Sequence, residues 1–418
     1  MSFRVIKYFG LFIVFQEFIK QLLGLQFIQN IDEFIILILF LVTILNGKFR
    51  TIKTDKYFIT IIIMGFISNY LNSKIDIATF ADLIIFSKFY MYFHVVRTTQ
   101  ISKKQTEEFY NFFKILGLLF LFVATMELFF PFIVKKILWG NNLPPIRDIR
   151  YGFYGAGSFM KFAGYFGAFM VFCAVLSFSN YLLFGRKVDL FFILIFFLGI
   201  IASTRRKSIL GFIIAIMIYL LFMNNMKIKN KYLKIFLLIL SLAVIFLLFY
   251  DLILNIIYSG LFYLQDYDSL DIARNALFII SIVIGLEYFP LGVGFGKFGG
   301  AVSFLYYSEF YYKYNLNNVY GLRPGIDAVR FGMDTFWPYV LGEVGIIGLL
   351  LFLFIIIYFF KYAKNSLALI SYNNKYFAMV VVLLLIAYLP DTFTAPVFSN
   401  TYYIYFIITP LGFLGIKK

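Results

Sequence analysis

Apolar stretches long enough to cross a lipid bilayer recur along the whole of this 418-residue chain. A helix needs about 20 predominantly apolar residues to span the hydrocarbon core, and helices satisfy their own backbone hydrogen bonds there. The chain is 62% hydrophobic and 14% charged, with a mean hydropathy of +0.89, outside the range of soluble globular proteins. We therefore expect an all-α polytopic membrane protein with about twelve transmembrane helices in a single integral membrane domain, residues 1–418. The expected helices lie near 7–28, 33–47, 57–72, 78–96, 109–130, 157–184, 189–203, 208–224, 233–254, 336–361, 376–390 and 398–415.

Basic residues in alternate connections set the expected orientation. Lys and Arg are retained on the cytoplasmic side, and one set of connections holds most of them, from Arg4 and Lys7 to Lys417 and Lys418. Both termini are then cytoplasmic, and the first helix is an uncleaved span because no small-residue cleavage site follows it. The net charge of +16 is accordingly a topology signal, and we expect no nucleic acid partner.

Two long loops face outside in this orientation, 131–156 and 255–335. The second lies between the ninth and tenth helices and carries an apolar helix at about 273–289, which Pro290 ends. The glycine-rich turn Gly292–Gly296 follows a helix rather than a strand, unlike phosphate-binding loops. A connection of this length is uncommon unless it is functional, so we expect it to fold back over the outer mouth of the bundle.

One basic cluster does not follow the rule that Lys and Arg stay on the cytoplasmic side. Thr204–Ser208 contains Arg205, Arg206 and Lys207 and falls on the outer side, between two apolar spans. Guanidinium groups match phosphate oxygens, so this cluster is a candidate binding site for a lipid pyrophosphate. The alternative is a solvated charged loop. Five other arginines share the outer side: Arg147, Arg150, Arg274, Arg323 and Arg330.

Acidic residues fall in the same zone. Glu343 and Asp82 lie near the outer ends of their helices, where an ionisable group marks either a functional site or a structural ion pair. The structural alternatives are a pair of Glu343 with an arginine and a pair of Asp82 with Lys161. Asp334, just before the tenth helix, is placed either as a general base or as a helix N-cap.

Three other features are expected to be structural. His94, the single histidine, lies near the cytoplasmic end of its helix and is expected to be packed or interfacial. The single cysteine, Cys173, excludes a disulfide. The acidic cluster Asp266, Asp268 and Asp271 is a weak signal for a divalent cation, and a solvated loop is the alternative.

Four stretches together resemble the bacterial O-antigen polymerase and O-antigen ligase family of integral membrane glycosyltransferases. Ser203–Leu210 is similar to the family's Ser-Arg turn and new helix, and Ala273–Gly294 to its Arg-helix with a Pro-Leu-Gly-x-Gly turn. Asp334–Phe336 occupies the place of its His-Asn pair, and Leu341–Gly348 is similar to its Glu-x-Gly helix start. The resemblance implies a GT-C-like bundle in the cytoplasmic (inner) membrane with an active site on the outer face.

The resemblance also implies a substrate and roles for residues. The substrate is a sugar repeat unit on undecaprenyl pyrophosphate, and other partners are membrane lipids, a chain-length regulator and a flippase. The implied catalytic residues are Arg206, with Arg205 as the alternative register, Arg274 and Asp334, with no cofactor and no metal. Ligases of the family carry a histidine where this chain has Asp334, which favours a polymerase of lipopolysaccharide O-antigen or a related glycan. The alternatives are a ligase, a flippase or transporter of the lipid-linked glycan, and a non-catalytic assembly subunit. Substrate-binding roles are assigned to Arg205, Lys207, Arg147, Arg150, Arg323, Arg330 and Glu343.

Overall fold

The computed structural model describes residues 2–140, 149–150, 153–219, 221, 270–325, 335–368 and 371–415. These residues form fifteen α-helices and one two-stranded antiparallel ribbon, so the all-α expectation is confirmed. The helices are α1 (Phe3–Leu23), α2 (Ile31–Leu45), α3 (Lys53–Asn72), α4 (Ile77–Val96), α5 (Lys103–Phe129), α6 (Pro131–Trp139), α7 (Ala163–Phe184), α8 (Lys187–Ala202), α9 (Arg206–Ile218), α11 (Leu270–Glu287), α12 (Ala301–Leu305), α13 (Glu309–Lys313), α14 (Trp337–Ser366), α15 (Tyr372–Ala387) and α16 (Thr401–Phe413). The ribbon pairs β1 (Ile149–Arg150) with β2 (Phe153–Tyr154), and the 3-10 turns are η1 (Gln26–Asn30), η2 (Ser158–Met160), η4 (Leu316–Asn318) and η5 (Pro390–Phe393).

Every helix expected from an apolar stretch coincides with a helix in the structure, except 233–254, which lies outside the described residues. Four segments are long and apolar enough to cross a membrane by length and composition. This finding supports a membrane protein. The four segments are Lys103–Phe129, Ala163–Phe184, Trp337–Ser366 and Asn373–Phe393.

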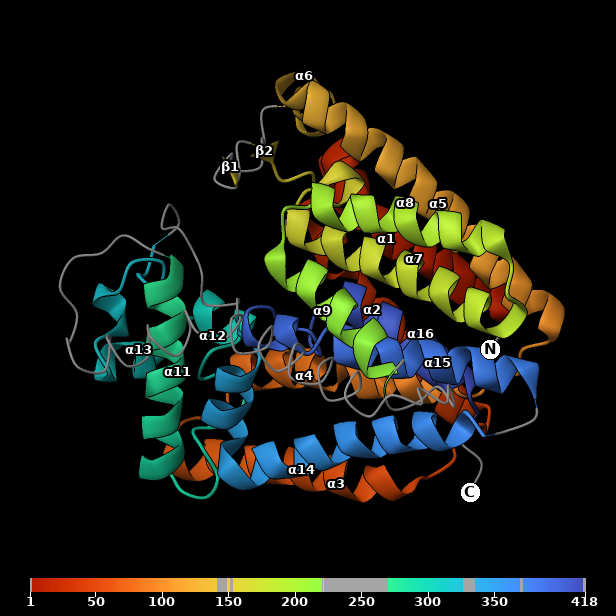
Figure 1. Cartoon of the computed structure of the whole chain (residues 1–418). Coiled ribbons are helices and arrows are strands. Elements are labelled where there is room, and N and C mark those ends of the chain that lie inside the picture. The colour runs from red at the N-terminus through yellow and green to blue at the C-terminus, as the bar shows by residue number, and fades with distance from the viewer. Residues whose placement is uncertain are drawn as a thin grey trace.

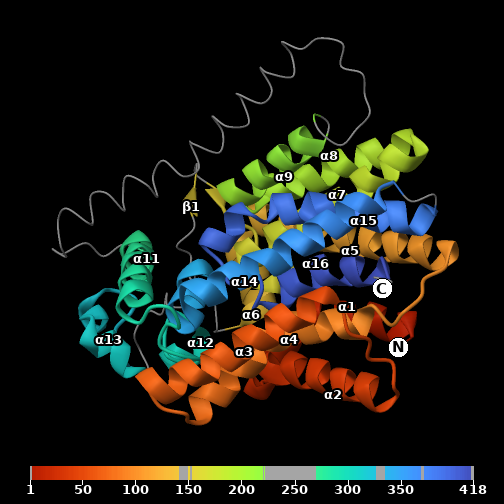
Figure 2. The same cartoon turned by 90° about the horizontal axis from the view of Figure 1, so that it is seen from below.

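The most buried helices lie at the centre of the bundle. α15 and α16 lie between α7 and α9 on one side and α4 on the other, as Figure 2 shows. Along α7 and α16 nearly every side chain is buried, because helices surround them, whereas α5 presents apolar side chains such as Phe122 and Ile115 outward. Outward apolar faces of this kind suit a lipid environment.

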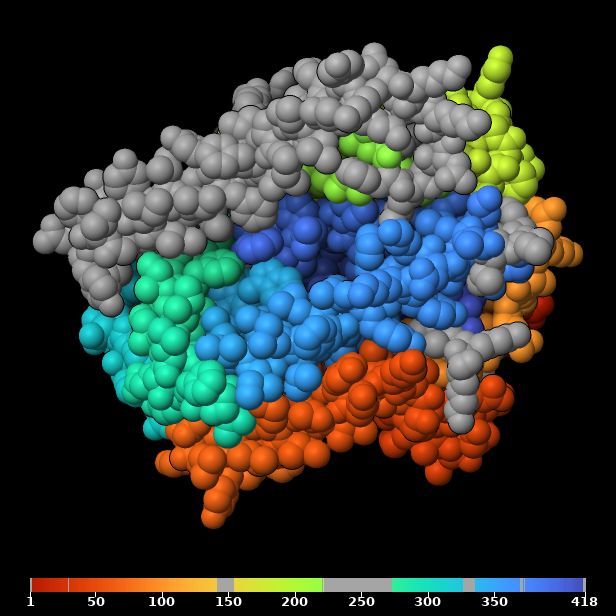
Figure 3. Space-filling view, turned by 60° about the horizontal axis from the view of Figure 1, so that its bottom comes forward, coloured from red at the N-terminus to blue at the C-terminus, as the bar shows by residue number. Residues whose placement is uncertain are grey.

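The two marked chain ends lie at one end of the bundle, and α11–α13 lie at the other (Figure 1). α11 packs against α14, and the α11–α13 unit has its own apolar core, which includes Leu277, Phe304 and Tyr311. Figure 3 shows this unit seated against α14 and the adjoining end of α3. The helix expected at 273–289 is confirmed as α11, and the described part of the 255–335 loop is therefore folded.

Two differences from the expected helix boundaries concern the site. The 131–156 loop contains a helix, α6, as well as the β-ribbon. α7 begins at Ala163 rather than at 157, because Ser158 and Lys161 adopt left-handed backbone conformations with φ of 50° and 65°. The buried carboxylate of Glu127 holds this non-helical loop by accepting hydrogen bonds from the Gly157 and Ser158 amides, at 3.0 and 2.8 Å.

Candidate functional site

The basic cluster begins in a tight turn between α8 and α9. Ser203 Oγ donates to the Ile200 carbonyl at 2.6 Å and accepts from the Arg205 amide at 3.3 Å. Thr204 has a φ of 54°, a strained conformation for a β-branched residue that costs about 1–3 kcal/mol. The segment at 155–156 packs directly on this turn, since the Ala156 amide donates to the Ala202 carbonyl at 3.0 Å and a Cβ on Gly155 would lie 3.0 Å from the Ser203 carbonyl oxygen.

The structure corrects the extent of that turn. α9 starts at Arg206, so Arg206 and Lys207 belong to the first turn of a helix and Arg205 is its N-cap. The first turn contains no acidic residue. A helix N-terminus carries a partial positive charge, so three cations there are unfavourable unless an anion is close. The helix end and the cations together therefore form a strongly anion-attracting position.

An acidic residue that was not expected faces this cluster. Asp391, in η5 at the end of α15, is buried and lies within electrostatic range of Lys207 and Arg205. Tyr403 is hydrogen-bonded to the same carboxyl group, while Asp391 Oδ2 accepts no hydrogen bond from a described residue. Among the described residues, the Asp391 carboxylate thus faces two of the three basic residues, Arg205 and Lys207.

Close backbone packing brings Asp391 to the cluster. A Cβ on Gly211 of α9 would lie 2.1 Å from the carbonyl oxygen of Ala387 at the end of α15. Only a residue without a side chain fits at this crossing. The N-terminal turn of α9 is consequently held beside η5.

α11 and the start of α14 complete the surroundings of η5. The ring of Phe278 stacks on that of Phe393, with centroids 6.4 Å apart, and Arg274 lies one helical turn before Phe278 on the same face of α11. The Phe336 amide donates to the Thr392 carbonyl at 3.3 Å, and Trp337 Nε1 donates to Thr392 Oγ1 at 2.9 Å. Segments far apart in the sequence therefore meet around Asp391.

Glu343 has a different environment. Its side chain is fully buried, and Oε1 accepts from the Lys297 and Phe298 amides at 3.0 and 3.2 Å. The carboxyl group of Asp82 lies close enough for the two buried acidic groups to interact, and like charges this close disfavour ionisation of both. Tyr339 donates to Asp82 Oδ2 at 2.8 Å.

These contacts correct two expectations. Glu343 pairs with Asp82 and backbone amides rather than with an arginine, and Asp82 does not pair with Lys161. Lys161 lies instead over the ring of Trp139, with its Nζ 5.8 Å from the centroid. The buried carboxyl of Glu343 holds the chain at 297–298, which makes it a positioning group in this structure.

The glycine-rich turn docks on a kink of α14. Gly345 has φ 68° and ψ −170°, which interrupts the helix, and a Cβ there would lie 2.2 Å from the Pro290 carbonyl oxygen. The Val293 and Gly294 amides donate to the Gly342 and Glu343 carbonyls at 2.9 and 2.8 Å. Because these amides are used within the protein, the turn is a structural joint and not a phosphate cradle.

An ion pair gives this joint a pH dependence. Lys297 Nζ lies 2.7 Å from Asp76 Oδ2, at the residue that caps α4. Burial alone raises the pKa of the Asp76 carboxyl, but the hydrogen bonds from Lys297 and the Thr79 amide outweigh it and hold the pKa below its ordinary value. The stabilisation is therefore present above about pH 4 and is lost as the pH falls through the folded-state pKa.

We expect hydrogen exchange of the 293–298 amides, corrected for intrinsic rates, to accelerate below about pH 4. The effect should stay below about 1 kcal/mol, because the Asp76 side chain is 45% exposed and solvent screens the pair. Asp76→Asn should remove this acceleration of exchange below about pH 4. Equal acceleration in the variant and the parent protein would contradict the assignment.

The remaining expected site residues are not gathered at η5 within the described ranges. Arg323 is exposed and donates to the Asn318 carbonyl at 3.4 Å, in the α11–α13 unit. Arg150 contributes its backbone to β1. The calls on Arg147, Arg330 and Asp334, and the Asp266–Asp268 part of the acidic cluster, lie outside the described residues. His94 is buried, with Nε2 3.0 Å from Asp55 Oδ1, which confirms its structural placement.

Comparison with known proteins identified no related family or curated protein. Within the described residues, Asp391 lies within electrostatic range of Arg205 and Lys207, and α11 reaches η5 through the contact of Phe278 with Phe393.

Sequence reasoning missed Asp391 although a signal was present. Leu389-Pro390-Asp391 ends an expected helix on the outer side, where an acidic residue beside a proline marks a fixed turn. What could not be read from the sequence is that α9 crosses α15 at Gly211 and so brings Asp391 to the cations.

Proposed function

We propose that this protein is a polysaccharide polymerase of the cytoplasmic (inner) membrane. It joins repeat units of O-antigen or a related surface glycan, each carried on undecaprenyl pyrophosphate, at the outer face. The observation that supports the proposal is the cluster of three basic residues at the start of α9, two of which, Arg205 and Lys207, lie within electrostatic range of the buried Asp391. Two guanidinium groups and an ammonium group at a helix N-terminus suit the binding of a pyrophosphate group at a membrane surface.

The proposed membrane arrangement has about twelve spans and cytoplasmic termini. The marked chain ends lie at the end of the bundle opposite α11–α13 (Figure 1), as this orientation requires. The turn between α8 and α9 would then open to the outside, where a lipid-linked glycan presents its pyrophosphate at the headgroup level.

In the proposed reaction, a hydroxyl of the incoming repeat unit attacks the anomeric carbon of the growing glycan. A C–O bond forms there, and the bond from that carbon to the pyrophosphate oxygen breaks. The hydroxyl proton passes to a carboxylate, for which Asp334 is the candidate and Asp391 a second one. Arg206 and Arg274 stabilise the negative charge that develops on the departing undecaprenyl pyrophosphate.

Deletion of the gene in its own host tests this assignment against its alternatives. We expect the surface polysaccharide to stop at one repeat unit, seen as the loss of the ladder on a gel. A full-length glycan that accumulates on its lipid carrier would instead indicate a ligase. Repeat units that accumulate on the cytoplasmic face would indicate a flippase.

A further inference from the structure

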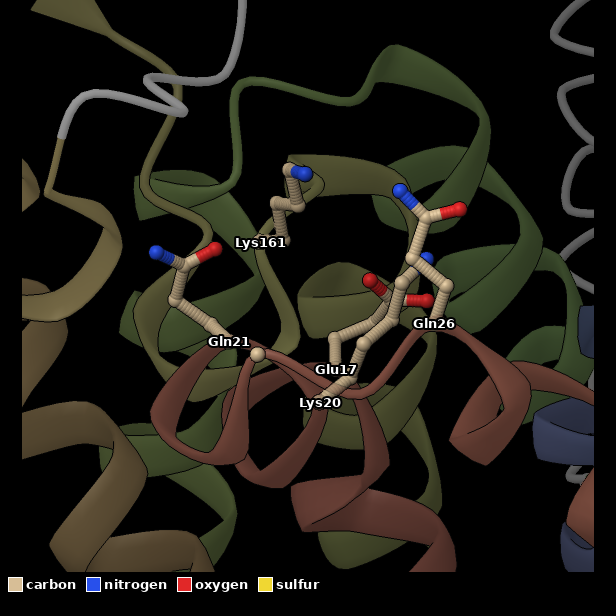
Figure 4. Close-up of a pocket in the computed structure, with 6 residues that line it drawn as sticks. Glu17, Lys20, Gln21, Gln26 and Lys161 are labelled. Atoms are coloured by element: carbon tan, nitrogen blue, oxygen red, sulfur yellow. The ribbon is translucent and has the colours of Figure 1, made fainter.

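A polar cavity of about 380 Å³ opens beside the C-terminal end of α1, and its lining includes no residue of the cluster at η5. Figure 4 shows Gln21 and Gln26 on its two flanks and Lys161 facing them from a separate loop. Its size falls in the range of small-molecule binding sites. Its lining differs from theirs, because charged and amide groups line this cavity whereas most such sites are lined by apolar groups. The lining residues are Glu17, Lys20, Gln21, Gly24, Gln26 and Lys161.

The first wall of this cavity is fixed by a buried network. Gln16 Nε2 donates to the Ile28 carbonyl at 2.9 Å and to Asp32 Oδ1 at 3.0 Å, which ties η1 to α1. Asp32 also forms a salt bridge with Lys88 at 3.3 Å and a hydrogen bond with Thr401. Gln26 is therefore held at a set position relative to Glu17.

The opposite wall is the loop that carries Lys161. This residue keeps a left-handed conformation, φ 65°, which a lysine adopts only where its surroundings impose it. Glu127 imposes it by binding the Gly157 and Ser158 amides, and the Lys161 ammonium lies over the ring of Trp139. The ammonium group is thus aimed at the cavity by two buried contacts.

We infer that this cavity binds a sugar residue that carries a carboxylate, such as a hexuronic acid. Amide and carboxylate side chains hydrogen-bond hydroxyl groups in both directions, which suits a saccharide. The Lys161 ammonium, held at the cavity by its loop, is the group that would pair with the carboxylate of an acidic sugar.

The cavity and the cation cluster are joined by tyrosines, and the inference rests on the proposed function in this respect. Tyr402 interacts with Glu17 and stacks on Tyr165 with ring centroids 4.7 Å apart. Tyr403, the next residue, interacts with Arg205 and Asp391. The start of α16 therefore lies between Glu17 of the cavity wall and Asp391 of the cluster.

Trp139 provides a direct readout. The chain has two tryptophans, Trp139 and Trp337, so a Trp337→Phe protein reports from the cavity wall alone. Purified protein in detergent is titrated with a glucuronate-containing disaccharide and with lactose. We expect a saturable fluorescence change, with half-saturation by the acidic disaccharide at a concentration about tenfold lower. Lys161→Met should abolish this preference, and Lys136→Met, at an exposed lysine of α6, should retain it.

Two results would overturn the inference: no saturable change with either disaccharide, or the same tenfold preference in Lys161→Met. The titration requires neither catalysis nor a lipid carrier. A protein that binds the acidic disaccharide but forms no polymer would therefore refute the proposed function alone.

Discussion

Replacement of Arg206 by alanine is expected to reduce chain extension by about 10²–10³-fold, the cost of removing one preorganised donor from a developing anion. Arg206 occupies the first position of α9, where the helix N-terminus adds to its charge. The measurement is the ladder of surface polysaccharide in a host that carries only the variant gene. We expect single repeat units in place of long chains.

Arg274→Ala should give the same loss, because α11 brings Arg274 to the turn at η5 through the contact of Phe278 with Phe393. Arg206→Lys should recover only part of the activity, since lysine keeps the charge but not the planar fork of donors. Arg186→Ala is the matched control, at an exposed arginine between α7 and α8. Normal ladders from both Arg206→Ala and Arg274→Ala would contradict the pyrophosphate role.

Asp391→Asn is expected to have two opposite effects. The substitution keeps the shape of the side chain but removes the internal anion that faces Lys207 and Arg205. The cations should then hold a pyrophosphate more tightly, by about tenfold, since unit charges a few ångströms apart interact by a few kcal/mol at a partly exposed site. Chain extension should slow by a similar factor, because the product lipid leaves more slowly.

Both effects can be measured in one protein. Trp337 donates to Thr392, the neighbour of Asp391, so a Trp139→Phe protein reports undecaprenyl pyrophosphate binding by its fluorescence. Asp391→Ala removes the side chain as well as its charge, so Tyr403 also loses its partner, and we expect this variant to be about 1–3 kcal/mol less stable than Asp391→Asn. If Asp391→Asn bound undecaprenyl pyrophosphate more weakly and also extended chains more slowly, Asp391 would have only a structural role.

The helices were predictable because apolar length alone decides where a membrane helix can lie. α3, expected at 57–72 and found at Lys53–Asn72, differs only at the end where Asp55 accepts from the Ile52 amide. The start of α7 was not predictable, since it depends on the contact of Glu127 with amides about thirty residues away.

The candidate site was predictable only in part. Arg206 was visible as a charge on the unexpected side of the membrane, a local property of the sequence. The contact between Glu343 and Asp82 was not predictable, since the two residues are far apart in the chain and both are acidic. The position of Asp391 beside the basic cluster depends on how closely α9 approaches α15 at Gly211. No local sequence pattern predicts such a contact.

Reconstitution tests the central claim most directly. Lipid-linked repeat units extracted from the gene-deleted host are incubated with purified protein in detergent, where no sealed membrane allows transport. We predict a ladder of longer lipid-linked glycans, formed without other proteins and absent with Arg206→Ala. Repeat units that stay single with the parent protein, or an equal ladder with Arg206→Ala, would contradict the account.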